Sequence, residues 1–202
     1  SSELFNVHLT SERYSNSSNN IVFDITPNKY SPKNCINDNI CADKILLLFG
    51  GNGMGYKYSE IDVIDIIESL NNIANAHDKE IICVTSRRSN ERHEKMLKSK
   101  LKNLSPNSIW FHAGGKNACL NKLFSTSQHI YVTEDSAMMI SESISSGRNV
   151  TTLYPDNFKS PQRYSKQINS YLEKGFIERM KIGQDLQINS SNLLRQKVDI
   201  YR

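Results

Sequence analysis

Continuous apolar runs alternate with segments of helical periodicity along most of the chain. Short runs rich in β-branched and aromatic residues predict buried strands at 45–49, 80–85, 109–112, 129–133 and 150–154. Between the first two runs, apolar residues recur at helical spacing from Ile61 to Ile73. Alternating strands and helices joined by short links predict an α/β protein: a Rossmann-like, doubly wound parallel sheet of about five to six strands.

Several helix ends are marked by their residue types. Ser59 is expected to cap the first long helix, and Asp135 or Ser136 to cap a helix over 137–146. Gly147 stands where a left-handed residue ends that helix. Further helices are expected over 90–104 and through Leu120 and Leu123.

The two ends of the chain differ from this regular middle. Residues 1–43 read as an irregular N-terminal arm or interdomain segment, with one short strand possible at 21–25. Residues 44–202 are expected to form the Rossmann-like domain, including bracing C-terminal helices within 160–202. One of these is expected over 160–173 with Gly175 behind it, and another over 190–201.

Composition narrows the functional classes. The 202 residues leave room for one α/β domain with peripheral segments. The net charge of +4 is scattered, so the basic stripe that argues for nucleic acid is missing, whereas an anionic small ligand fits. The four cysteines lack the spacing of a zinc site, so no metal is expected; a Cys35–Cys41 bridge stays open. No run approaches the roughly 18 apolar residues of a membrane span.

Polar and glycine-rich segments follow the expected strands at their carboxyl ends, where open parallel sheets bind ligands. These segments supply the candidate binding residues, and no catalytic residue is assigned. The candidates are Gly50, Gly51, Asn52, Gly53, Thr85, Ser86, Arg87, Arg88, His112, Thr133, Glu134, Asp135, Ser136, Ala137, Met138, Ser141 and Glu142.

The glycine-rich loop at 50–55 does not match two familiar phosphate motifs. In a dinucleotide fingerprint Tyr56 would occupy the third glycine position, and Thr85-Ser86 stands where an acid would hold a ribose. A P-loop needs Gly-Lys-Ser/Thr, but the chain has Gly55-Tyr56-Lys57. The loop therefore either brings backbone close to a ligand or is simply flexible.

The other candidates also have two interpretations. Arg87 and Arg88 either clamp a phosphate or carboxylate or belong to a solvated helix start. His112 either touches a base or sugar or is structural. The turn before Ala137 exposes backbone N–H groups that attract phosphate, with Glu142 about 9 Å along the helix from Ser136, within reach of a ribose. The alternative is an ordinary βα unit with polar caps.

Four segments together resemble a known family. Phe49-Gly50-Gly51-Asn52, Val84-Thr85-Ser86-Arg87-Arg88, the stretch 132–142 (VTEDSAMMISE) and 146–150 (SGRNV) are similar, in this order, to the carboxyl-terminal half of the mitochondrial-fission ELM-like family. The resemblance runs from about Lys44 to Gly175. Two departures put the shape of a base or sugar pocket in question: Asn117-Ala118-Cys119 replaces Asn-Pro-Tyr, and Asn149 replaces a proline.

The resemblance implies the donor-binding domain of a metal-independent glycosyltransferase of the GT-B fold. Ser136 and its neighbours would contact the diphosphate of a nucleotide sugar, and Glu142 would bind its ribose. The nucleotide sugar is then the substrate, and no cofactor is expected. The implied partner is an N-terminal Rossmann-like domain that carries the acceptor site and commonly the catalytic base. A cytoplasmic location is expected, with association at a membrane surface left open.

Two other functions stay open. The fission role of plant relatives implies a non-enzymatic interaction module that keeps the fold and recruits protein partners with its surface. A nucleotide-sugar hydrolase or epimerase using the same strand-end cleft is the third reading.

Overall fold

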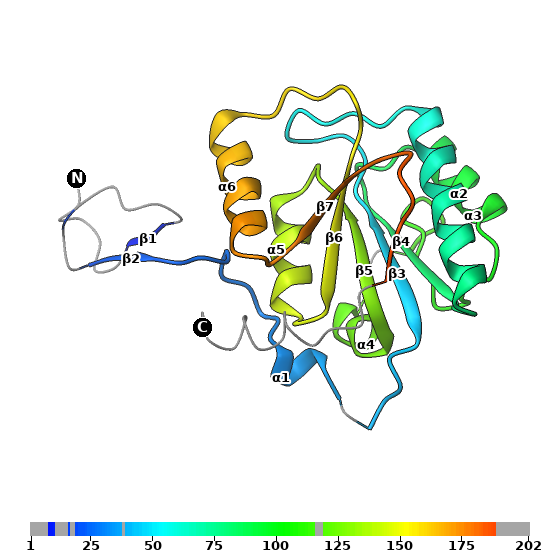
Figure 1. Cartoon of the computed structure of the whole chain (residues 1–202), viewed down its shortest axis with the longest axis horizontal. Helices are drawn as coiled ribbons and strands as arrows, with labels where there is room; N and C mark the ends of the chain where they lie inside the picture. The colour runs from blue at the N-terminus through cyan, green and yellow to red at the C-terminus, as the bar shows by residue number, and fades with distance from the viewer. Residues whose placement is uncertain (1–7, 11–15, 17–18, 38, 116–118, 189–202) are drawn as a thin grey trace.

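A parallel five-stranded sheet forms the centre of the protein (Figure 1). The computed structural model describes residues 8–10, 16, 19–37, 39–115 and 119–188. The strand order is β4-β3-β5-β6-β7, and every pair is parallel. The strands are β3 (Lys44–Phe49), β4 (Ile81–Thr85), β5 (Ser127–Thr133), β6 (Asn149–Tyr154) and β7 (Glu178–Lys181).

The three inner strands are almost entirely buried, as expected of parallel strands that are covered on both faces. In the centre of the sheet Leu47 of β3 pairs with Cys83 on one side and Tyr131 on the other. All three side chains are inaccessible to solvent. The core therefore lies along β3 and β5, the strands that position the loops described below.

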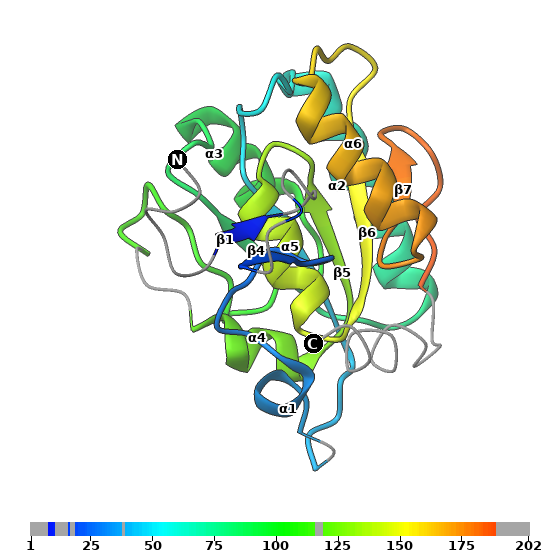
Figure 2. The ribbon, with the colours of Figure 1, turned by 90° about the vertical axis from the view of Figure 1, so that its left-hand side faces the viewer.

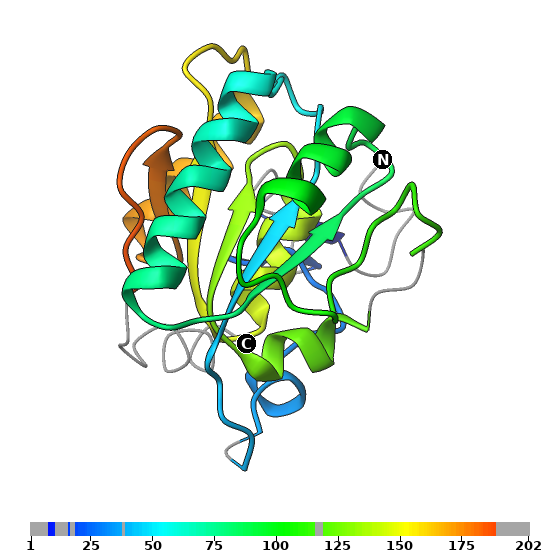
Figure 3. The ribbon, with the colours of Figure 1, turned by 90° about the vertical axis from the view of Figure 1, so that its right-hand side faces the viewer.

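Helices cover both faces of the sheet. The helices α2 (Glu60–Ala76) and α3 (Glu91–Lys100) lie on one face (Figure 3). The helices α5 (Ala137–Ser145) and α6 (Gln162–Glu173) lie on the other (Figure 2). Helix α4 (Leu120–Thr126) packs beside the short α1 (Pro32–Cys35), near the amino end of β5. The expected doubly wound parallel fold is confirmed.

The predicted helix boundaries follow from their caps. Ser59 begins α2 in a reciprocal capping box: its Oγ accepts from Asp62 N–H at 3.2 Å, and Asp62 accepts from Ser59 N–H at 2.7 Å. Ser136, one of the two caps considered, begins α5. Gly147 and Gly175 follow their helices with φ of +76° and +65°, the left-handed region that glycine adopts without strain.

The N-terminal segment is more regular than its sequence predicts. Strands β1 (His8–Thr10) and β2 (Asn20–Val22) form a separate parallel pair on the side of α5, away from the main sheet (Figures 1 and 2). Helix α1 follows, with Pro32 in its first turn. Cys35 and Cys41 are both free thiols, so the bridge left open between them is not formed.

The prediction of a strand at 109–112 is wrong. Only Ile109 pairs with β4 there, donating to Cys83 O at 2.8 Å and accepting from Thr85 N–H at 2.9 Å. Just before it, Ser108 N–H closes a turn onto Ser105 O, and Pro106 has no N–H to offer a ladder. Two residues after Ile109, Phe111 N–H donates to the side-chain hydroxyl of Thr85, so it is not available to pair with the backbone of β4.

One strand was missed and one predicted helix is untested. Strand β7 occupies the edge beside β6, and its sequence Glu-Arg-Met-Lys lacks the apolar run of a buried strand. The helix predicted over 190–201 lies outside the described residues. Among the described helices, none combines the length and apolar character needed to cross a bilayer.

Candidate functional site

The strand order places two candidate loops side by side. Strand β3 lies next to β5, although β4 follows β3 in sequence, so the chain reverses its direction of winding between β3 and β5. Helix α2 leaves β3 toward one face of the sheet, and α5 leaves β5 toward the other (Figure 1). Ligands of doubly wound sheets bind in the crevice at such a switch point. The glycine-rich loop after β3 and the turn after β5 meet there.

The turn from β5 into α5 is buried up to the helix start. Residues 133–136 are all buried, and Ser136 Oγ accepts from Met139 N–H at 3.4 Å as the helix cap. The N–H groups of Ala137 and Met138 donate to no protein acceptor among the described residues. Met138 is half exposed. These two N–H groups form the open part of the predicted anion-binding turn.

The side chain of Asp135 is buried behind this turn, against Gly50. Its carboxylate is fully buried, accepts from Thr133 Oγ1 at 2.7 Å, and lies 3.1 Å from Arg88 Nη2. The Arg88 contact is an ion pair without good hydrogen-bond alignment, because Asp135 Oδ2 accepts no hydrogen bond among the described residues. Burial raises the pKa of Asp135 to about 6, against the opposing effects of Thr133 and Arg88.

The glycines of the loop at 50–55 are needed for close approach to protein atoms. A Cβ on Gly50 would lie 2.2 Å from Asp135 Oδ2, and one on Gly51 2.2 Å from Arg88 O. Gly53 and Tyr56 exchange backbone hydrogen bonds of 3.1 and 2.8 Å across Met54 and Gly55. Both central residues have positive φ, as in a type I′ turn, which leaves the Met54 side chain exposed at the tip.

The predicted arginine pair is divided. Arg88 is bound to Asp135, whereas Arg87 is exposed and pairs with no acid among the described residues. Ser86 Oγ donates to Gly50 O and accepts from Arg88 N–H at 3.1 Å, so it ties the β4 turn to the glycine loop. Ser86 and Arg88 therefore lie at the glycine loop, but the two arginines do not form a clamp that is open to a ligand.

Glu134 is tied to the opposite edge of the sheet. Its buried carboxylate accepts from Arg179 of β7 at 2.8 and 2.9 Å and from Thr152 Oγ1 at 2.7 Å. Its backbone N–H donates to Tyr58 OH, and its carbonyl accepts from Tyr164 OH. These contacts fix the strand end and leave no carboxylate oxygen free of a partner.

Thr85 and His112 support the β4 side of the site. Thr85 Oγ1 donates to the buried Glu94 at 2.6 Å, and Glu94 also accepts from the N–H groups of His112 and Ala113. The His112 ring nitrogen Nε2 lies 2.8 Å from Ser89 O. Both residues hold the 111–113 segment in place, and neither lines the cavity described next.

Glu142 and Ser141 lie on the side of α5 that meets other elements. Glu142 is half buried; burial raises its pKa, and the nearby Lys29 acts in the opposite direction. Ser141 is buried within hydrogen-bonding distance of Tyr171 OH, at 3.1 Å. Glu142 therefore faces the N-terminal segment around Lys29 rather than the strand-end crevice.

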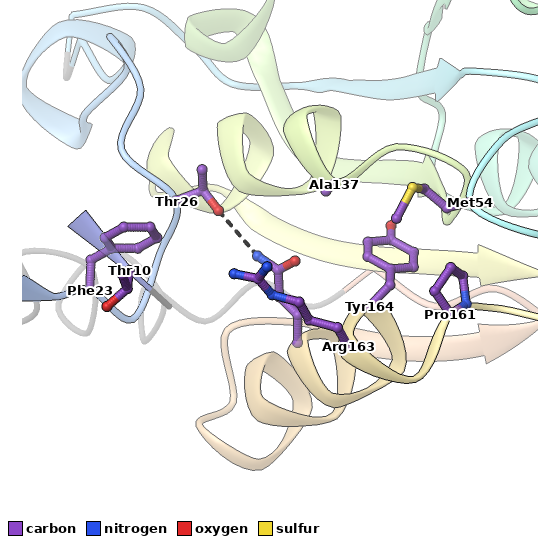
Figure 4. Close-up of a pocket in the computed structure, with 9 residues that line it drawn as sticks. Thr10, Phe23, Thr26, Met54, Ala137, Pro161, Arg163 and Tyr164 are labelled. Carbon is purple, nitrogen blue, oxygen red and sulfur yellow. Dashed lines mark hydrogen bonds between the residues drawn. The ribbon is translucent and has the colours of Figure 1, made fainter. Parts of the chain in front are cut away.

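A cavity of about 420 Å³ opens beside the start of α5 (Figure 4). Its walls come from the tip of the glycine loop, the first turns of α5 and α6, and the N-terminal segment. Of the candidate residues predicted from sequence, only Ala137 lines it. The lining residues are Thr10, Phe23, Thr26, Met54, Ala137, Pro161, Arg163, Tyr164 and Gln167.

Comparison with known sequence families assigns the chain. The pattern of the family described as mitochondrial fission ELM1 matches residues 24–198. The protein belongs to the mitochondrial fission ELM1 family. The resemblance recognised in the four sequence segments is thereby confirmed, and it extends across the N-terminal segment from Asp24. Comparison with curated protein sequences gives no match.

The fold of this ELM1-family chain is found in a solved structure. The crystal structure of the glycotransferase of kitacinnamycin superposes with a TM-score of 0.51 and 13% identity, covering 80% of this chain and 38% of that one. Acinetobacter baumannii MurG gives a TM-score of 0.49 and 11% identity, covering 99% of this chain and 55% of that one. The chain thus spans about two fifths to about half of these proteins. The likeness shows the fold alone, and it agrees with the expected Rossmann-like α/β fold.

Sequence reasoning missed most of the cavity of this ELM1-family protein. Its walls join segments that are far apart in sequence, such as Phe23, Met54 and Tyr164. One local signal was available: Arg163 stands in the first turn of α6, where the helix dipole favours acids and disfavours a cation. No group of three or more metal-ligating side chains occurs within the part of the chain that the structure describes.

Proposed function

We propose that this domain binds the donor of a GT-B-type, metal-independent glycosyltransferase, a nucleotide-diphosphate sugar. The observation that carries the proposal is the cavity at the start of α5, beside the switch point between β3 and β5. Its volume of about 420 Å³ falls within the range of small-molecule sites, roughly 300–1,000 Å³. Family membership and the shared fold support the same function.

The diphosphate is proposed to meet the N–H groups of Ala137 and Met138. These are unbonded among the described residues, and the positive end of the α5 dipole adds to their attraction for phosphate. Ser136 holds the helix start, and Asp135 with Gly50 shapes the floor beneath it. The nucleotide sugar is the substrate in this proposal, and no cofactor is added.

Glu142 remains the proposed ribose ligand, but its position near the N-terminal segment limits how a ribose could approach it. Because it lies near Lys29, a ribose would reach it only along the N-terminal segment. The remaining candidates on the β4 side, Thr85, Ser86, Arg88 and His112, are proposed to position the loops rather than to touch the donor.

Calorimetric titration with UDP, GDP, CMP and TDP sugars tests this function. Ala137→Glu should abolish binding, because its carboxylate repels phosphate while stabilising a helix N-terminus. Ala137→Gln has a similar volume without the charge and should retain more affinity, which separates charge from steric filling. Failure of the folded wild-type chain to bind any of these sugars contradicts the proposal.

A non-enzymatic interaction module is the second candidate. It is favoured by the internal pairing of Asp135 with Arg88 and Glu134 with Arg179, which occupies charged groups at the strand ends. Met54 and Met138 are also exposed apolar side chains beside the cavity, a composition suited to protein contacts. In this case the titrations show no sugar-nucleotide binding although the chain is folded.

A further inference from the structure

The cavity at the start of α5 is closed on one side by the N-terminal segment. Phe23 and Thr26 form that wall, opposite Pro161 and Tyr164 of the α6 start (Figure 4). Gln167 of α6 donates to Thr26 Oγ1 at 3.1 Å, which joins the two walls.

The same wall is fixed to α5 by Asn28. Its amide donates to Ser145 Oγ at 2.9 Å and to Ser141 O at 3.2 Å. The Asn28 Oδ1 atom accepts from Tyr30 N–H at 2.9 Å, which fixes the orientation of the amide. The wall is therefore held by hydrogen bonds to both helices, so the cavity is a built feature of the fold.

Among the described residues that line the cavity, Arg163 is the only charged one. Its side chain extends from α6 toward the N-terminal segment (Figure 4), and it pairs with no acid among the described residues. Three of the described acids near the cavity are engaged elsewhere. Their pairs are Asp24 with Lys174, Glu134 with Arg179, and Asp135 with Arg88.

The position of Arg163 works against the local helix. It lies in the first turn of α6, which contains no acid, and the N-cap Pro161 makes no side-chain cap. A cation at this end is opposed by the helix dipole and by the unbonded N–H groups. An anion lying between the guanidinium and the helix start would remove this repulsion.

The rest of the lining suits the uncharged part of such a ligand. Phe23, Met54, Pro161 and Tyr164 give a mainly apolar surface, with Thr26 and Gln167 as the polar groups nearby. Small-molecule sites combine an apolar lining with a few polar or charged groups that fix orientation. A phosphate ester with a flat or apolar body meets both requirements.

We infer that Arg163 is the cation that binds the phosphate of the ligand. It takes the role that was predicted from the sequence for Arg87 and Arg88. The inference deepens the proposed function and rests on it for the identity of the ligand as a nucleoside diphosphate. Arg88 is occupied by Asp135, and Arg87 does not line the cavity. The guanidinium of Arg163 presents the planar donors that phosphate oxygens accept.

Titration of the chain with inorganic pyrophosphate and with UDP tests this assignment. Arg163→Gln should weaken binding of both by about tenfold or more, the loss that follows removal of a charged hydrogen bond. Arg163→Lys should lose less, because it keeps the charge but not the fork. Backbone amide NMR should place the pyrophosphate-induced shifts at Ala137 and Arg163.

Arg92→Gln is the matched control. Arg92 is an exposed arginine on α3, on the other face of the sheet, where it pairs with Glu60. Its substitution should leave both affinities unchanged, and unfolding curves should show that all three variants fold.

The outcomes separate the two proposals. If sugar nucleotides bind and Arg163→Gln binds them as tightly as the wild type, this inference is overturned and the proposed function stands. If pyrophosphate binds through Arg163 but no sugar nucleotide binds, the proposed function fails and the anion site remains. If the wild-type chain binds neither probe, both are overturned.

Discussion

Asp135 illustrates how a single residue can be placed by its neighbours rather than by its local sequence. On sequence it is a possible helix cap, but Ser136 takes that role and the Asp135 carboxylate turns inward beneath Gly50. Burial of an acid with only one partially exposed arginine for compensation disfavours the charged form. The raised pKa of Asp135 is the consequence.

Asp135→Asn should therefore change how stability depends on pH. The pKa of Asp135 is about 6 in the folded protein against 3.8 ordinarily, so between these values the unfolded chain releases its proton first. Stability then falls as pH rises from about 4 to about 6, by a contribution on the order of 3 kcal/mol. The Asn variant should lose this slope. At neutral pH its free energy of unfolding, measured by urea denaturation, should exceed that of the wild type by about 1–3 kcal/mol.

Asp156→Asn provides the comparison for that experiment. Asp156 is exposed and pairs with Lys181 on the surface, so its substitution should leave the slope between pH 4 and pH 6 nearly as in the wild type. An Asp135→Asn protein with the wild-type slope would show that the Asp135 carboxyl does not titrate in this range.

At the scale of elements, β7 is held to the sheet by a buried ion pair as well as by its ladder. Arg179 binds Glu134 with two hydrogen bonds, and its guanidinium lies 4.1 Å from the ring centroid of Tyr154. Glu134 has no solvent exposure, so the pair reaches from the edge strand across β6 to the end of β5. This contact also holds the residue next to Asp135 in place.

Arg179→Gln should destabilise the protein by about 3–5 kcal/mol, because it leaves the Glu134 carboxylate buried without its cation. The free energy of unfolding in urea measures the effect. Lys181→Gln on the same strand breaks the exposed pair with Asp156 and should cost about 0–1 kcal/mol. Equal losses in the two variants would contradict a special role for the buried pair.

Sequence pattern predicted the elements whose signals are local. The strands at β3, β5 and β6 and the helices capped by Ser59 and Ser136 were readable from apolar runs and caps. The false strand at 109–112 had the right composition, but the side chains of Thr85 and Glu94 accept hydrogen bonds from the N–H groups of Phe111 and His112. Strand β7 was missed because its polar residues are accommodated by Glu134 and Asp156, which sequence does not place beside it.

At the scale of the whole molecule, the strand order decides where distant loops meet. Sequence predicted that candidate residues gather at the carboxyl ends of the strands, and the β3–β5 neighbourhood brings the glycine loop to the turn before α5. It did not predict the wall formed by Phe23 and Thr26, because residues 1–43 carry no periodic signal. The cavity is a property of three segments together.

The proposed function has a consequence for activity. The chain spans 38% of the length of the glycotransferase it resembles in fold, and an acceptor site and catalytic base are proposed to lie in another Rossmann-like domain. The chain should therefore bind a donor sugar without transferring or hydrolysing it, as followed by release of the nucleoside diphosphate. Turnover by the chain itself, with or without an added acceptor, would contradict this division of roles.

From the parallel pair β1–β2 we expect an effect on the protein in concentrated solution. Parallel strands are ordinarily covered on both faces, yet Ile21 and Val22 of β2 are 50% and 41% exposed. A two-stranded sheet is also at the lower limit of independent stability, and its outer edges have no further strand among the described residues. Such edges accept strands from neighbouring molecules. At high protein concentration, self-association should begin at the β1–β2 pair. Ile21→Lys should reduce it, because a charged side chain on an edge strand opposes pairing with another molecule.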